Sequence, residues 1–309
     1  MYNICIISIY FGKFPNYFNL WLSSCGLNPT FNFLLITDQR ISNAPTNVKI
    51  LVTDLKSIHQ RFENAIRRKV SLDKPYKLCD LKPMYGITFA DELKEADFWG
   101  HCDIDLIWGN LNKFITDDIL NKYDKIFSLG HLSLYRNAKN INEAYKLAGS
   151  SRGNYEDVIS TNKSCVFDER YGINKIFKHN SLPIYEKEVA ADIGFRNKRM
   201  LIAGIQNRNY PLQIFYVDEG RCMRAYIEDG IIKHDEFAYI HLQKRQYENT
   251  VDSKSYIVGP NRFYGMTPIT VELIKKINPY RGSFYERFEY LYKDYKFRIN
   301  RRFKQLFIK

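Results

Sequence analysis

Two aspartates, Asp103 and Asp105, stand one residue apart between two apolar runs of the chain. On a regular strand, side chains at positions i and i+2 point to the same face, so both carboxylates can reach one ligand. Hard oxygen ligands suit Mg²⁺ or Mn²⁺, and such a cation neutralises a diphosphate leaving group. A D-x-D pair alone is a weak signal, and two solvated loop carboxylates are the alternative. The apolar flanks favour the metal site, because desolvated carboxylates must be paired or metal-bound.

His241 is a second candidate metal ligand. A single histidine on an apolar strand is more often a satisfied core residue than a ligand, and that alternative stays open. However, Lys244 and Arg245 follow it closely in the sequence. A neutral imidazole together with two carboxylates forms a suitable ligand shell for Mn²⁺.

The elements that must position the aspartate pair follow an alternating pattern. An apolar, β-branched run predicts a strand over residues 3–10, and further short runs predict strands over residues 33–38, 48–52 and 97–102. Between them we predict a helix opened by Pro15, a helix capped by Thr53 or Asp54, and a helix from residue 81 to 93. This alternation predicts a mostly parallel sheet covered by helices, with the aspartate pair directly after the fourth strand.

The pattern changes in the second half of the chain. After a strand at 125–129 and a short helix at 141–148, further strands are predicted over residues 212–217, 222–227, 231–233 and 237–242. Glu219-Gly220 and Asp229-Gly230 supply turns between the first three of these, which indicates an antiparallel meander. We therefore predict an α/β fold, with a mixed sheet flanked by helices, over residues 1–250. A basic, aromatic-rich helical extension is predicted over residues 251–309.

Composition limits the class of protein. The chain has 309 residues, of which 45% are hydrophobic and 15% aromatic, so it can bury a sizeable core and is not disordered. Its net charge is +12, and half of that excess comes from residues 281–309, where nine basic residues face three acidic ones. A basic excess indicates a polyanionic partner, which can be nucleic acid, an anionic membrane or a phosphorylated substrate.

Two further observations concern the cellular compartment. The six cysteines are scattered and have no metal-binding spacing, which is typical of reduced thiols in the cytosol. No run approaches the ~18 consecutive apolar residues of a membrane span, and the N-terminal apolar stretch lacks a signal peptide's charged flank. We expect a cytoplasmic protein, with a peripheral location on the inner face of the plasma membrane as the alternative.

Two stretches of the chain carry a resemblance to a known family. Residues 76–86 (YKLCDLKPMYG), followed by residues 97–105 (DFWGHCDID), resemble a family of bacterial polysaccharide-biosynthesis proteins from capsule and O-antigen clusters. Similar segments are also found at residues 9–13, 166–169 and 240–245. Members of that family are regarded as glycosyltransferases of the GT-A fold and include galactofuranosyltransferases. The resemblance implies a GT-A-like, Rossmann-related fold and transfer of a hexosyl residue, such as galactofuranosyl, from a UDP-sugar.

The resemblance also implies roles for single residues. Asp103 and Asp105 match the metal- and donor-binding D-x-D, and His241 matches a late histidine that completes the metal shell in several GT-A families. The implied donor-binding residues are Tyr10, Phe11, Asp38, Lys77, Asp80, Lys82 and Lys244. Among them, Asp80 and Lys82 match an acidic and basic pair used on the donor's sugar hydroxyls and phosphate. The first three lie at the ends of the first two predicted strands, where open α/β sheets bind ligands.

A transferase of the inverting type also needs a carboxylate that accepts the proton of the acceptor hydroxyl. Asp168 and Glu169 are the best candidates for this general base, and adjacent carboxylates in a strand face opposite ways, so only one can serve. A solvated turn is the alternative for that segment. Asp192 is a reserve candidate for the base, and His131 is a candidate acceptor contact with an equally plausible structural role.

The C-terminal segment combines aromatic and basic residues at helical spacing. Its apolar stripe consists of Phe284, Phe288, Leu291, Tyr295, Ile299, Phe303 and Leu306. Such a helix can lie on an anionic membrane surface, or it can pack on the domain with a basic outer face. Both interpretations stay open.

Other functions fit the sequence less well. A nucleic-acid-binding protein would explain the charge, but no recognition module is apparent, and no G-x-x-x-x-G-K-[ST] or G-x-G-x-x-G motif is present. A catalytically inactive, membrane-associated scaffold of a polysaccharide assembly complex is the main alternative. We predict a glycosyltransferase that uses Mn²⁺ or Mg²⁺, a UDP-sugar donor, and a glycan or lipid-linked oligosaccharide acceptor, with no nucleic-acid partner.

Overall fold

The computed structural model describes residues 2–204 and 206–306, with side chains described up to residue 300. The chain divides into two compact units, and each is treated separately. Unit 1 consists of Met1–Phe14, Trp21–Ile104 and Leu111–Glu188. Unit 2 consists of Pro15–Leu20, Asp105–Asn110 and Val189–Lys309. The division therefore falls between Asp103 and Asp105, and the boundary predicted at residue 250 lies within unit 2.

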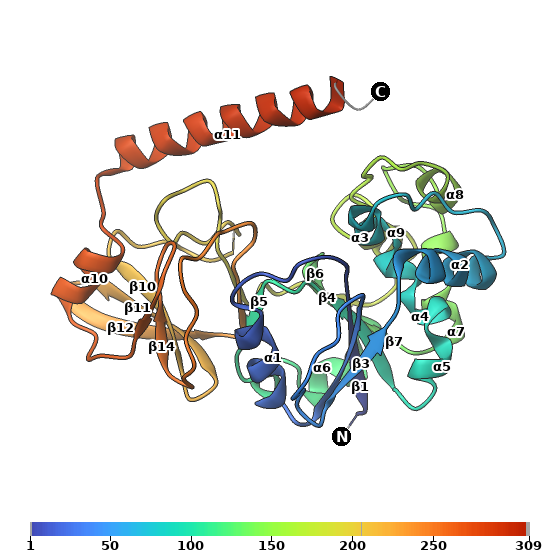
Figure 1. Ribbon diagram of the computed structural model, residues 1–309, viewed down its shortest axis with the longest axis horizontal. Helices are drawn as coiled ribbons and strands as arrows, with labels where there is room; N and C mark the ends of the chain where they lie inside the picture. The colour runs from blue at the N-terminus through green and yellow to red at the C-terminus, as the bar shows by residue number, and fades with distance from the viewer. Residues whose placement is uncertain (1, 205, 307–309) are drawn as a thin grey trace. The chain divides into compact units, whose positions relative to one another are not determined.

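Unit 1 is built on a seven-stranded mixed sheet in the order β3-β2-β1-β4-β7-β6-β8 (Figure 1). Its strands are β1 (Ile4–Tyr10), β2 (Phe31–Thr37), β3 (Val48–Val52), β4 (Phe98–Cys102), β6 (Lys125–Leu129), β7 (Leu132–Arg136) and β8 (Ile184–Tyr185). Strands β1 to β4 pair in parallel, whereas β7 runs antiparallel to both β4 and β6. The carboxyl ends of β1, β2 and β4 consequently lie along one edge of the sheet.

Helical segments of unit 1 cover this sheet. The longer ones are α1 (Phe18–Gly26), which begins in unit 2, α2 (Leu55–Ile66), α6 (Asp117–Lys122), α8 (Tyr155–Ile159) and α9 (Ile173–His179). Single turns are η1 (Pro75–Lys77), α3 (Leu78–Leu81), η2 (Lys82–Met84), α4 (Tyr85–Thr88), α5 (Ala90–Leu93), η3 (Leu111–Lys113), α7 (Lys139–Asn142) and η4 (Ala144–Lys146). A mixed α/β fold with a mixed sheet flanked by helices is thereby confirmed.

Most predicted elements of unit 1 are present, with two corrections. Asp54 caps α2 as predicted, because its carboxylate accepts a hydrogen bond from the Ser57 N–H at 2.7 Å. The single helix predicted over residues 81–93 is wrong, since this region consists of four short turns. Pro83 lies in the 3₁₀ turn η2, and the backbone leaves helical geometry at Met84 (φ −100°, ψ 1°) and at Phe89 (φ −115°, ψ 30°). The helix predicted over residues 141–148 is likewise replaced by the two turns α7 and η4.

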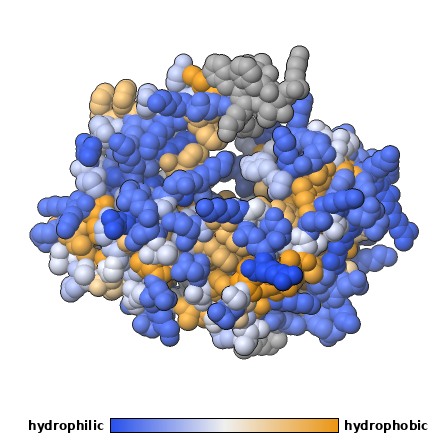
Figure 2. Space-filling view, viewed as in Figure 1, coloured by the Kyte–Doolittle hydropathy of each residue, from blue (hydrophilic) through white to orange (hydrophobic). Residues whose placement is uncertain are grey.

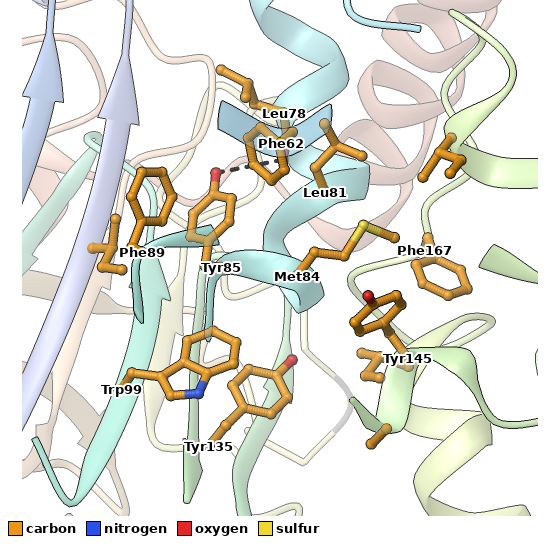
Figure 3. Packing of buried hydrophobic residues seen from close by; sticks show 14 of the residues in the cluster. Phe62, Leu78, Leu81, Met84, Tyr85, Phe89, Trp99, Tyr135, Tyr145 and Phe167 are labelled. Carbon is orange, nitrogen blue, oxygen red and sulfur yellow. Dashed lines mark hydrogen bonds between the residues drawn. The ribbon is translucent and has the colours of Figure 1, made fainter. Parts of the chain in front are cut away.

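These short turns pack their apolar side chains on the sheet. Met84, Tyr85 and Phe89 lie in one buried cluster with Trp99 of β4 and Tyr135 of β7 (Figure 3). The rings of Trp99 and Tyr135 stack with centroids 4.5 Å apart. Leu81 and Met84, on either side of Lys82, both belong to this cluster, so the core fixes the backbone that carries the lysine.

Unit 2 is formed largely by antiparallel strands. A five-stranded sheet has the order β12-β11-β10-β14-β15, and a three-stranded sheet has the order β5-β13-β9. The strands are β5 (Leu106–Trp108), β9 (Ala190–Asp192), β10 (Gln213–Asp218), β11 (Arg221–Glu228), β12 (Ile231–Phe237), β13 (Tyr239–His241), β14 (Tyr256–Val258) and β15 (Phe263–Gly265). The helices are α10 (Val271–Ile277) and α11 (Ser283–Leu306). The predicted meander corresponds to β10, β11 and β12, whereas β13 belongs to the smaller sheet.

Pairing across residue 250 explains why the predicted boundary does not separate two units. Strand β14 pairs with β10, so that Tyr256, Ile257 and Val258 lie opposite residues 215–217. The surface of the molecule is mainly hydrophilic on the face shown in Figure 2, with apolar side chains in small patches. Within the described residues, no helix is both long and apolar enough to span a bilayer.

Candidate functional site

A cluster around Lys82 lies at the carboxyl edge of the unit 1 sheet. The Nζ of Lys82 is 2.7 Å from the Oδ1 of Asp103, 2.7 Å from the carbonyl oxygen of Gly130 and 3.4 Å from the Oδ2 of Asp168. Asp103 comes directly after β4, and its N–H donates to the carbonyl of His131 at 3.1 Å. Two predicted donor- and metal-binding residues and one predicted general base are thus brought together. His131 takes part through its backbone.

Burial makes the charges of this cluster interdependent. Lys82 and Asp168 are each only 5% exposed. Burial alone would lower the pKa of Lys82, but the nearby anionic groups, Asp103 foremost and Asp168 among them, outweigh it and raise that pKa well above its usual value. Burial also raises the pKa of Asp168 to about 7, against the opposing effect of Lys82 and with a further contribution from Glu169. Asp168 is therefore a buried carboxyl group that can exchange a proton near neutral pH.

A glycine allows the two candidate bases to approach the β6–β7 turn. A Cβ atom at Gly130 would lie 2.7 Å from the Oδ2 of Asp168 and 2.5 Å from the Oε1 of Glu169. A side chain at this position would therefore displace both carboxylates, and with them the contact between Asp168 and Lys82. Of the two, Asp168 is the buried one and contacts Lys82, whereas Glu169 is partly exposed.

Lys77 and Asp80 form a separate, fully buried ion pair, with the Lys77 Nζ 2.9 Å from the Asp80 Oδ2 and both side chains 1% exposed. The Asp80 carboxylate also accepts hydrogen bonds from the N–H groups of Cys165 and Phe167 at 2.9 and 3.0 Å. This pair fixes the backbone immediately before Asp168. Direct contact of Lys77 or Asp80 with a donor stays a prediction, since neither faces solvent.

The predicted nucleoside-binding residues lie at the carboxyl ends of β1 and β2. These parallel strands place Tyr10 opposite Thr37. The Asp38 carboxylate accepts hydrogen bonds from the Gly12 N–H at 3.1 and 3.2 Å, and Gly12 adopts a φ of +97°. Asp38 thereby holds the loop that carries Tyr10 and Phe11 along the same edge of the sheet.

A second cluster lies in unit 2, where β5, β13 and β9 meet. His241 on β13 is flanked by two carboxylates: its Nδ1 is 2.7 Å from the Oδ1 of Asp192, and its Nε2 is 3.4 Å from the Oδ1 of Asp105. Strand pairing explains this proximity, because His241 lies opposite Leu106 on one side and Asp192 on the other. Gln243, at a φ of +52°, donates from its amide to the same Asp192 oxygen at 2.8 Å.

The charge on His241 follows from these partners. Burial alone would lower its pKa, but Asp105 and Asp192 outweigh burial and raise the pKa to about 10. The ring is therefore an imidazolium between two carboxylates. A divalent cation would replace the Nε2 proton, because only neutral imidazole coordinates a metal. The donor set fits Mn²⁺ or Mg²⁺: Asp105 and His241 can serve as ligands, and Asp192 orients the ring as carboxylates often do behind metal-binding histidines.

Sequence reasoning missed two features of these clusters. It named Asp192 as a reserve base, whereas the structure places it behind His241. It did not connect Lys82 with Asp168, because the contact spans a long stretch of chain. Lys244, which the resemblance implies binds the donor, follows His241 in unit 2, and its contact with a donor stays a prediction. Its Nζ is 5.2 Å from the centre of the Phe297 ring.

Comparison with known proteins gives a family without an assigned activity. Residues 6–268 match the model of a family described as a family of unknown function (DUF6625). No curated protein matches the chain. The match includes every candidate site residue in both clusters.

Proposed function

The chain belongs to this family of unknown function (DUF6625), and we propose that it is a metal-dependent glycosyltransferase of the GT-A type that takes a hexosyl residue from a UDP-sugar. The observation that carries the proposal is the contact of His241 with both Asp105 and Asp192. Asp105 stands two positions after Asp103, the residue that follows β4. An imidazole fixed by one carboxylate and facing a second is a preformed pair of ligands for a divalent cation. The resemblance of residues 76–105 to capsule and O-antigen glycosyltransferases supports the same activity.

The residues of unit 1 would perform the proton transfer. Asp168 would accept the proton of the acceptor hydroxyl as the acceptor oxygen bonds to the anomeric carbon and the sugar–phosphate bond breaks. Its raised pKa suits a base that works near neutral pH. Lys82 remains protonated beside Asp103 and Asp168, and it supplies a fixed positive charge at the sheet edge. Tyr10, the adjacent Phe11 and Asp38 would hold the nucleoside.

The cation would supply positive charge to the departing diphosphate. Asp105 and His241 would hold it. The prediction that Asp103 is a ligand of the same ion stays a prediction, since Asp103 belongs to the other unit and contacts Lys82. The proposed acceptor is a glycan or lipid-linked oligosaccharide.

Release of UDP from UDP-hexoses, measured with and without Mn²⁺, tests the proposal. We expect turnover that depends on the metal. Asp105→Asn and His241→Gln should each reduce it by about 10²–10³-fold, because a metal contributes several kcal/mol to stabilising the leaving group. Asp218→Asn is the matched control, since Asp218 is a partly buried carboxylate of unit 2 that contacts Ser255 instead.

Two results would contradict the proposal. Full turnover in Asp105→Asn or in metal-free protein would exclude the assigned metal ligands. Folded wild-type protein that binds Mn²⁺ but hydrolyses and transfers no UDP-hexose would favour the inactive scaffold instead. A thermal-shift panel of nucleotide-sugars with Mn²⁺ identifies the donor to use.

A further inference from the structure

The C-terminal helix α11 has an inner face that packs on unit 2. Arg199 forms an ion pair with Glu286, and the Nε of Arg196 is 2.9 Å from the Oδ1 of Asp294. Further along, the rings of Phe195 and Phe297 meet edge to face with centroids 5.5 Å apart. These contacts fix the rotation of the helix about its own axis.

The opposite face of α11 is apolar and exposed. It carries four large side chains at spacings of four, three and four residues, which places them on one side of a helix. These are Phe284, Phe288, Leu291 and Tyr295, which are 87%, 63%, 56% and 65% exposed. A contiguous row of exposed aromatic side chains is costly in water and typically marks an interaction surface.

The charges of the helix are sorted between the two faces. All three acidic residues of the segment face unit 2 and are 18%, 12% and 13% exposed, namely Glu286, Glu289 and Asp294. The exposed charged residues beyond that face are all basic: Arg287, Lys296 and Arg298, of which Arg298 also contacts Asp294. The outward surface of α11 therefore combines aromatic rings with positive charge and has no exposed carboxylate within residues 283–300.

A cavity on the inner side of the helix is also rich in positive charge. It has a volume of about 500 Å³ and lies within unit 2. Its charged lining residues are Lys198, Arg199, Lys244, Arg245, Arg281, Lys293, Glu286 and Glu289. Six cations thus face two carboxylates. Both carboxylates are already within ion-pair distance of cavity lysines or Arg199, so the cavity keeps an excess of positive charge.

We propose that the outward face of α11 is a docking surface for an anionic phospholipid bilayer. The helix would lie in the plane of the surface with Phe284, Phe288 and Leu291 among the acyl chains, while the basic residues contact phosphate headgroups. A second copy of the chain is a poorer partner, because two outward faces would bring like charges together. This docking is independent of the transferase activity, since it uses none of the residues of the two clusters.

Sedimentation of the full chain with vesicles tests the proposal. We expect binding to vesicles of phosphatidylcholine with phosphatidylglycerol, and much weaker binding to phosphatidylcholine alone. The double variant Phe288→Ser/Leu291→Ser should bind at least about tenfold more weakly, because it removes two inserted apolar side chains. Arg287→Glu/Lys296→Glu should reduce binding in the same direction, and added salt should weaken wild-type binding.

The control variants carry the same kinds of substitution, apolar to serine and basic to glutamate, at positions outside α11. Ile231→Ser removes an apolar side chain on β12 that is 63% exposed, and Lys139→Glu/Lys163→Glu reverses two exposed charges of unit 1. Both should bind vesicles like the wild type. Equal binding by Phe288→Ser/Leu291→Ser and its control would overturn the proposal. So would sedimentation velocity showing that the same variant breaks a dimer while vesicle binding is unchanged.

Discussion

In each of the two clusters a positively charged side chain contacts two carboxylates, but the consequences differ. In unit 1 the Lys82 ammonium contacts Asp103 and Asp168, and in unit 2 the His241 imidazolium lies between Asp105 and Asp192. Each group is buried, and in each case the carboxylates more than offset the effect of burial on its pKa. The surroundings are therefore similar, and the difference lies in the group at the centre.

That difference decides which cluster can accept a metal. A lysine whose pKa is raised well above its usual value keeps its proton at every physiological pH and repels a second cation. A histidine with a pKa of about 10 is also protonated, but its Nε2 would become a ligand if a divalent ion displaced the proton. Unit 1 thus provides a permanent positive charge, and unit 2 provides one that a metal can replace.

Removing the permanent charge should produce the largest effect on stability. Lys82→Met leaves Asp168 buried without its counter-ion, so we expect the free energy of unfolding to fall by about 3–5 kcal/mol. Urea unfolding near pH 8, where Asp168 would otherwise be mostly ionised, measures the loss. Lys146→Met is the control, because its pair with Glu143 is about 40% exposed and should contribute roughly 1 kcal/mol or less.

A second variant distinguishes lost charge pairing from poor packing. Lys82→Met/Asp168→Asn removes the carboxylate as well, so part of the lost stability should return. If the single variant is as stable as the wild type, the Lys82 cluster is not the buried ion pair described, and the contrast with His241 fails.

A smaller effect is expected when the orientation of His241 is loosened. Asp192→Asn keeps the shape of the side chain but removes the charge that fixes the ring through Nδ1, and we expect Mn²⁺ affinity to fall by about 10–100-fold. Titration calorimetry measures this affinity directly and does not require a known sugar donor. An unchanged affinity would mean that Asp192 does not act behind a metal-binding histidine.

The positions of the strand ends could be predicted from the sequence, whereas the tertiary contacts of the charged side chains largely could not. Strands β1 to β4 were evident from short apolar runs, β-branched in β1 and aromatic in β4, and so were the positions of Tyr10, Asp38 and Asp103 at one sheet edge. Local periodicity carries that information. The turns over residues 81–93 were read as one helix because their apolar spacing is helical, although the backbone leaves helical geometry at Met84 and Phe89.

Long-range contacts could not be predicted in the same way. Asp192 was named only as a reserve base, since nothing near it in the sequence indicates that β9 pairs with β13 and brings it to His241. The contact between Lys82 and Asp168 is similarly non-local, and Asp80 supports it by accepting hydrogen bonds from the backbone immediately before Asp168. Such contacts follow from tertiary packing, and a single sequence records them only as isolated charged residues.

The smallest expected effect is the change of the wild-type free energy of unfolding with pH. It is small because His241 and Lys125, both buried and able to carry a positive charge, change that free energy in opposite directions. The folded pKa of His241, about 10, exceeds its ordinary value of 6.5, so its stabilisation is complete below pH 6.5 and is lost as the pH rises towards 10. Burial lowers the pKa of Lys125 in unit 1 to about 7 from 10.5. Its charged form is therefore destabilising below pH 7, and that cost disappears as the pH rises towards 10.5.

These two contributions oppose each other between pH 7 and 10, so single variants should separate them. Lys125→Met removes the contribution that rises with pH, so the free energy of unfolding of this variant should fall with pH more steeply than that of the wild type. His241→Gln removes the contribution that falls with pH, so the free energy of unfolding of this variant should rise with pH relative to that of the wild type. Urea midpoints measured at intervals between pH 6.5 and 10 give both slopes. If the two variants shift the slope in the same direction, the His241 ring is not held as an imidazolium, and the proposed exchange of its proton for a metal loses its basis.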